Sequence, residues 1–205
     1  MRIERRKGDR RQDDTFEREL REAVHGNAPE GRPCGTHCTA KCPVCGAADC
    51  QCACSRTCAN VPEMLSSDPD NLPLESKIAP LVYEINLLGF FRPCWSCEGH
   101  LGKDGSLWKV PRVWFYSSSQ IHVRLLAEAL YKLSFHKFLK VPWRVGVTFS
   151  DEDNRDTTYT LEPDLSQLGN AGLEALQGDA AVIAEHLSAA IKDQARKLSR
   201  DTSVS

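Results

Sequence analysis

The stretch from His25 to about Asp70 most limits how this chain of 205 residues can fold. It consists largely of Cys, Gly, Pro, Ala and Asp and holds almost no large apolar side chain. Such a segment cannot bury a core large enough to offset the conformational entropy that ordering costs. Something other than hydrophobic packing must therefore order it.

The thiols of this segment are the obvious candidates for that role. Eight of the ten cysteines in the chain lie here: Cys34, Cys38, Cys42, Cys45, Cys50, Cys52, Cys54 and Cys58. A C-x-x-C turn followed by Gly, as in Cys42 to Gly46, brings two thiolates and neighbouring backbone amides to one ion. Eight thiolates match about two tetrahedral zinc sites, and metal binding then supplies the missing folding energy. We therefore expect a zinc-binding module over residues 14–70, which also contains a short helix.

Other metal chemistries fit parts of the same spacing. The C-x-C-x-C run from Cys50 to Cys54 suits a multinuclear thiolate cluster. The C-x3-C-x2-C spacing from Cys38 to Cys45 is that of radical S-adenosylmethionine enzymes, but the rest of the chain is too short and too hairpin-like for their (β/α) barrel. An ordinary iron–sulfur cluster is the alternative to zinc, because thiolates hold both. Oxidised cysteine pairs and a thiol-rich store for soft metals are further alternatives.

Composition and charge describe a globular protein. The chain is 41% hydrophobic and 26% charged, and its formal net charge of −2 argues against a surface that traps nucleic acid as a whole. Residues 1–13 are basic and hold two apolar side chains, Met1 and Ile3, which are too few for a core, so we expect a disordered tail there. No segment approaches the roughly 18 consecutive apolar residues of a membrane span. We expect a cytoplasmic protein, and a reducing compartment favours metal ligation over disulfides.

The remainder, residues 71–205, carries the periodicities of an α+β domain. Apolar residues at helical spacing predict helices over 78–88, 117–139 and 172–198, the last with a possible interruption near Gly178. Alternation and β-branched or aromatic residues predict strands over 90–97, 111–118, 142–150 and 157–163. Because each strand pair has a short connection, we expect a four-stranded, largely antiparallel sheet covered by helices. In the third strand, alternation places Trp143, Val145 and Val147 on the inner face.

The segment PCWSCEGH, from Pro93 to His100, is a second constellation with several interpretations. Cys94, Cys97 and His100 can be metal ligands, closed by a residue of the N-terminal cluster. Cys94 and Cys97 can form a redox dithiol, although a helix start that would lower the pKa of the first thiol is missing. Cys97, Glu98 and His100 can form a reactive site with a thiolate nucleophile. The structural alternative is that Cys97 is a small buried hydrophobe and Gly99 a turn residue.

The string SCEGH, from Ser96 to His100, is followed by a Gly-containing turn and the aromatic strand VWFYSS. Over about Trp95 to Ser117 this resembles a motif of uncharacterised bacterial proteins. The resemblance implies that the turn is a site and that the protein is bacterial. It implies no activity.

Three other features have simple explanations. The acidic group Asp151, Glu152, Asp153 and Asp156 lacks the glycine and distal glutamate of an EF-hand and predicts a solvated turn. His122 and His136 are too far apart on one helix to share an ion, and we expect both near the surface. Tryptophans on strands are expected in the core, although an exposed Trp or Tyr pair beside Arg144 and Lys109 could stack on nucleic-acid bases.

The sequence thus favours a zinc-binding, non-catalytic binding or regulatory protein whose partner is a protein or a nucleic acid. The alternative is a small metal- or thiol-dependent enzyme with its site at Cys94–His100. Thiolate storage of soft metals is a third class, and the large core predicted beyond residue 70 argues against it.

Overall fold

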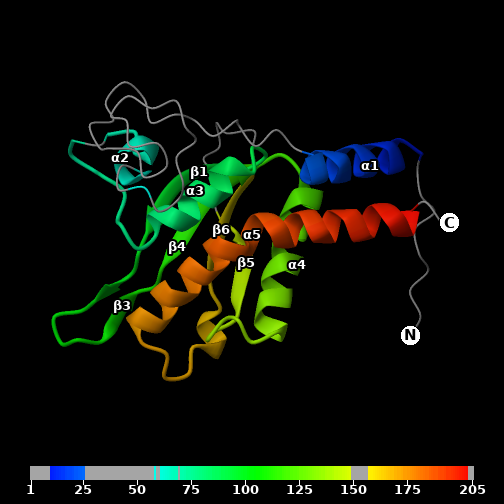
Figure 1. Ribbon diagram of the computed structural model, residues 1–205. Coiled ribbons are helices and arrows are strands. Elements are labelled where there is room, and N and C mark those ends of the chain that lie inside the picture. Colours follow the sequence, from blue (N-terminus) through cyan, green and yellow to red (C-terminus); the bar gives the residue numbers. More distant parts are fainter. Residues whose placement is uncertain (1–9, 26–57, 59–60, 69, 149–156, 203–205) are drawn as a thin grey trace.

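The computed structural model of the protein describes residues 10–25, 58, 61–68, 70–148 and 157–202. Figure 1 shows a sheet covered by helices that run across one of its faces. The elements are α1 (Arg10–His25), α2 (Val61–Leu65), α3 (Ala79–Leu87), β1 (Arg92–Cys97), β2 (His100–Leu101), β3 (Leu107–Lys109), β4 (Arg112–Ser117), α4 (Gln120–Phe135), β5 (Trp143–Val147), β6 (Thr157–Pro163), a 3₁₀ turn (Leu165–Gln167) and α5 (Leu173–Thr202).

The main sheet has four strands in the order β1-β4-β6-β5, and every neighbouring pair is antiparallel. This confirms the predicted α+β class. The chain passes from β1 to β4 through an arm formed by β2 and β3, and from β4 to β5 through α4. The predicted acidic turn between β5 and β6 lies outside the described residues.

The core lies between the sheet and the helices. Burial alternates along β4: Val113 and Phe115 are fully buried, while Arg112, Trp114 and Tyr116 are half-buried. Leu161 of β6, Leu125 of α4 and Ile183 of α5 join them in one cluster. Full burial of such a side chain contributes about 1.5–3 kcal/mol. Helix α5 packs against α1, α3 and α4 and thereby ties the helical layer together.

Local signals set the ends of the helices. Pro80 lies in the first turn of α3, where no backbone N–H is needed, and Gly89 follows the helix at a φ of +79°. Ser119 begins α4: its side chain accepts the backbone N–H groups of Ile121 and His122.

Three expectations about these elements need correction or adjustment. Helix α1 begins at Arg10, within the span predicted as tail. Helix α5 is continuous through Gly178, because this glycine is exposed and its cost of about 1 kcal/mol is offset by the buried residues around it. Val147 is 73% exposed rather than inward-facing, since it ends an edge strand that pairs on one side alone.

His122 is also placed differently from the prediction. It is buried, its ring stacks on Phe90 with centroids 4.2 Å apart, and its Nε2 lies 3.1 Å from the backbone oxygen of Glu19. Packing of α1 over the start of α4 therefore removes this histidine from solvent.

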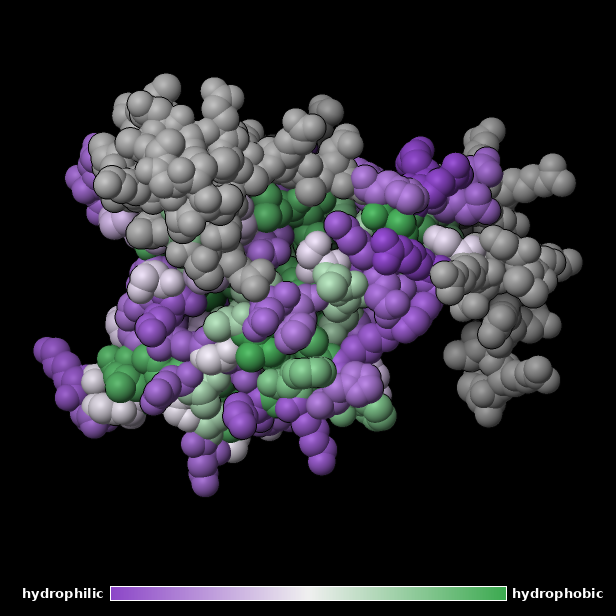
Figure 2. Space-filling model, in the orientation of Figure 1, coloured by the Kyte–Doolittle hydropathy of each residue, from purple (hydrophilic) through white to green (hydrophobic). Residues whose placement is uncertain are grey.

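Within the described residues, every helix is too short or too polar to cross a bilayer. Figure 2 shows that the face seen in Figure 1 is largely hydrophilic between small apolar areas.

Candidate metal centre

The SCEGH motif spans the end of β1, the turn formed by Glu98 and Gly99, and the start of β2. Cys97 is the last residue of β1, and His100 is the first residue of β2. Gly99 lies between them at a φ of +85°, a conformation that side chains with a Cβ rarely adopt. The resulting reversal lets the backbone N–H of Gly99 donate to Sγ of Cys97 at 3.4 Å. This contact fixes the position of the sulfur in the turn.

Gly99 is also required by packing. A Cβ at this position would lie 2.6 Å from Cδ1 of Leu173, 2.9 Å from the backbone oxygen of Lys109 and 2.9 Å from Cδ of Pro111. The turn is thus pressed between the end of β3 and the start of α5. Both the backbone conformation and the close packing therefore require glycine at position 99.

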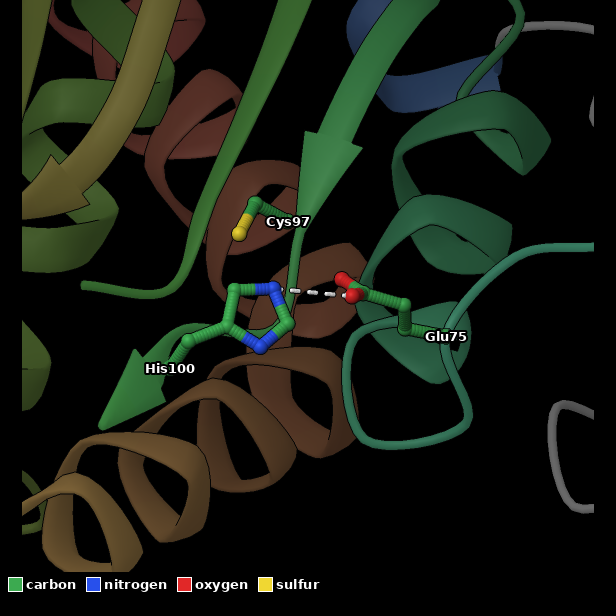
Figure 3. A group of neighbouring side chains, drawn as sticks. All are labelled: Glu75, Cys97 and His100. Atoms are coloured by element: carbon green, nitrogen blue, oxygen red, sulfur yellow. Dashed lines mark ion pairs between the residues drawn. The ribbon is translucent and has the colours of Figure 1, made fainter. Parts of the chain in front are cut away.

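A third side chain reaches the turn from another part of the chain. Glu75, which precedes α3, directs Oε1 to within 3.0 Å of Nε2 of His100. Glu75, Cys97 and His100 offer one ligand atom each, and these atoms all lie within 4.8 Å of one another. Figure 3 shows the three side chains converging from the loop before α3, the end of β1 and the start of β2.

Hydrogen bonds fix the orientation of this group. The backbone N–H of Glu98 donates to Oε2 of Glu75 at 2.6 Å. The carboxylate of Glu98 accepts the backbone N–H of Lys77 at 2.9 Å, so the two segments bind each other reciprocally. From α5, Nε2 of Gln177 donates to the backbone oxygen of Glu98 at 3.1 Å. Supporting bonds of this kind hold metal ligands in place in known sites.

Burial of the group is one-sided. Cys97 is 4% exposed, whereas the side chains of Glu75 and His100 are 36% and 39% exposed. The sulfur therefore lies on the protein side of the group, and the imidazole and carboxylate border solvent.

The donor set suits zinc. Zinc binds thiolate sulfur, imidazole nitrogen and carboxylate oxygen, and sites with three protein ligands keep a fourth position for water or another molecule. Iron–sulfur clusters are held chiefly by cysteine thiolates, and this group contains a single thiol. Among the described residues, the chemistry of the group thus favours one mononuclear ion.

The same geometry argues against a nucleophilic thiol here. A thiol–imidazole–carboxylate triad needs the thiol near one ring nitrogen and the carboxylate near the other. In Figure 3 the sulfur of Cys97 lies toward the ring edge that carries Nε2, which also faces Glu75, and Nδ1 points away from both. Three donors that converge on one point are arranged for a shared ligand. The burial of Cys97 also limits the approach of a substrate.

The remaining predicted site residues lie elsewhere. Cys94 is the extra residue of a β-bulge in β1 and is exposed, and it is not part of the group. Burial of its thiol raises its pKa, and a hydrogen bond with Tyr116 partly opposes this. Cys58 is half-buried against the apolar cluster of Val61, Ala79 and Tyr83. The predicted ligands outside the described residues are Cys34, Cys38, Cys42, Cys45, Cys50, Cys52 and Cys54.

Glu98, a candidate catalytic residue, supports the group through its backbone N–H and through the bond of its carboxylate to Lys77, but its carboxylate is not one of the three converging donors. Glu75 was not predicted at all. It lies 22 residues before Cys97 in a segment without cysteine or histidine, so no spacing pattern connects the two.

Comparison with family models, with curated proteins and with solved structures found no match to this chain.

Proposed function

We propose that the protein binds a zinc ion through Glu75, Cys97 and His100, and that this ion fastens the segment before α3 to the β1–β2 turn. The observation that carries the proposal is the convergence of three zinc-type donors within 4.8 Å. The protein is then a metal-stapled binding or regulatory protein of the kind that its cysteine-rich segment also suggests.

Electrostatics supports an ion at this position. A thiolate at Cys97 and the carboxylate of Glu75 repel each other when they lie this close, and a cation between them removes that cost. The neutral imidazole of His100 adds a third donor. Binding at such a site adds to the free energy of folding, because the ligands are brought together only in the folded chain.

A zinc-dependent enzyme is the second candidate, and one observation favours it. The side chains of Glu75 and His100 are each more than a third exposed, which leaves the fourth position reachable from solvent. A zinc ion with three protein ligands can lower the pKa of a bound water to about 7.

Metal analysis of the full chain tests the proposal. Zinc content per chain is measured after purification without added metal, for the wild type and for Glu75→Gln, Cys97→Ser and His100→Ala. Because the N-terminal cysteines also bind metal under our hypothesis, the difference from wild type is decisive. We expect each variant to lose about one ion, as removal of one of three ligands predicts.

Cys94→Ser is the matched control, since Cys94 is a cysteine of the same strand outside the group. It should keep the wild-type metal content. Equal zinc content in wild type and in all three ligand variants would overturn the proposal.

A further inference from the structure

The arm that β2 and β3 form borders the exposed side of the proposed zinc site, which consists of Glu75, Cys97 and His100. His100 and Lys109 are direct cross-strand partners in this arm. The ring of Trp108 lies 6.4 Å from that of His100, and Nζ of Lys109 lies 4.4 Å from the centre of the Trp108 ring. Figure 1 shows the arm extending away from the helices. An aromatic ring and a cation thus stand beside one proposed ligand.

The arm also exposes apolar surface. Leu101 is 51% and Trp108 67% exposed, although the protein buries Phe115 and Trp143 in its core. One of the small apolar areas in Figure 2 lies over the arm. Tryptophan buries a large area with little loss of side-chain freedom and is common in binding surfaces for that reason.

The charges favour an anion at the fourth position. A zinc ion bound by the thiolate of Cys97 and the carboxylate of Glu75 forms a neutral unit, because two negative ligands balance the ion. Lys109 then adds a positive charge on the exposed side. Glu98 is an acidic neighbour that keeps its charge, and its carboxylate is held by the backbone N–H of Lys77.

We infer that the fourth position takes the carboxylate of a small organic acid whose apolar or aromatic portion lies against Trp108. Lys109 provides the positive charge beside that carboxylate. The inference rests on the proposed zinc site and adds the chemical class of its ligand.

The test uses the full chain with Co²⁺ in place of zinc, because the visible absorption of Co²⁺ reports its ligands. The absorption of Co²⁺ bound by Glu75, Cys97 and His100 is the part of the wild-type spectrum that is missing in Glu75→Gln. Benzoate, acetate and neutral benzyl alcohol are then titrated separately. We expect benzoate and acetate to change this part of the spectrum saturably, and benzyl alcohol to leave it unchanged.

Contact with Trp108 should make benzoate bind about two- to tenfold more tightly than acetate, as an aromatic pair predicts. Trp108→Ala should remove this preference and keep acetate binding. Trp95→Ala is the matched control, since Trp95 is another exposed tryptophan, on β1 of the main sheet. It should leave the preference unchanged. Lys109→Gln should weaken the binding of both benzoate and acetate.

The outcomes separate the two proposals. Identical cobalt spectra for wild type and Glu75→Gln would overturn the zinc site itself. A cobalt signal that depends on Glu75 but responds to neither acid would leave the zinc site standing and overturn the inference. Equal affinity for benzoate and acetate in the wild type would overturn the role of Trp108.

Discussion

Replacing Gly99 by Ala tests whether the turn is shaped by packing as well as by backbone conformation. At a φ of +85°, an alanine costs about 1–2 kcal/mol relative to its preferred conformations. Its Cβ would also meet the backbone oxygen of Lys109 and the ring of Pro111 at 2.9 Å, and neither can turn aside. Overpacking of this kind costs about 1–3 kcal/mol. We therefore expect Gly99→Ala to lower the free energy of unfolding by about 2–5 kcal/mol.

Gly105 provides the matched control within the same arm. Its φ is +79°, but a Cβ there would have no neighbour within 4 Å. Gly105→Ala should therefore show the conformational cost alone, about 1–2 kcal/mol. The two substitutions change the unfolded chain in the same way, so that contribution cancels in the comparison. The difference between the variants, about 1–3 kcal/mol, measures the packing around Gly99.

Urea unfolding of both variants without zinc, in the presence of a chelator, gives the two free energies, so that a change in zinc binding does not enter the difference. Zinc affinity is measured in parallel, because a shifted turn would separate Cys97 from His100. We expect weaker zinc binding for Gly99→Ala and wild-type binding for Gly105→Ala. If both variants lose the same stability, the steric part of this reasoning is wrong.

Other consequences follow from single contacts. Asp179 is 1% exposed and accepts two backbone N–H groups of the loop before β5 at 2.8 and 2.9 Å. Asp179→Ala should therefore lower the free energy of unfolding, measured by heat or urea, by about 3 kcal/mol or more. Asp193→Ala, at the surface, should lower it by about 0–1 kcal/mol. The hydroxyl of Ser166 is the main group that lowers the pKa of Asp164 below its ordinary value of 3.8, so Asp164 stabilises the fold above that pH. The difference in melting temperature between wild type and Asp164→Ala should shrink as pH falls below this value, and a constant difference would contradict the assignment. Iodoacetamide labelling, read by peptide mass spectrometry, should rise at Cys97 when a chelator removes zinc and stay unchanged at Cys94; equal labelling of Cys97 with and without zinc would speak against ligation.

The fold could be predicted where a periodic pattern is long. Leu125, Leu126, Leu130 and Leu133 recur on one side of α4, and all are buried. A stripe of this length has no competing interpretation as a strand, and Ser119 supplies the start signal. The arm was predicted as a turn only, since β2 and β3 have two and three residues and show no alternation. Elements of this length are defined by their partner strand and not by their own sequence.

The candidate site shows where spacing arguments stop. A C-x2-C pair converges on one ion in a turn, but Cys94 and Cys97 lie in a predicted strand, where residues three apart point to opposite faces. The two predictions conflicted, and the structure follows the strand. Cys97 and His100 converge because the chain reverses direction at Gly99, which lies between them in the sequence. The third donor, Glu75, comes from a loop whose position depends on the packing of α3, which no local pattern encodes.

The position of Glu75 also shows how polar contacts help to hold the segment between α2 and α3 beside the core. Leu72, which lies between α2 and α3, is 72% exposed. Polar contacts accompany the packing of Leu74 there: the hydroxyl of Ser66 donates to the backbone oxygen of Leu72 at 2.6 Å, and Asp68 accepts the side chain of Asn71. Glu75 then joins this segment to the β1–β2 turn. Hydrogen bonds thus add to the packing of Leu65 and Leu74 in ordering this segment, and an ion at this point would stabilise the loop and the turn together.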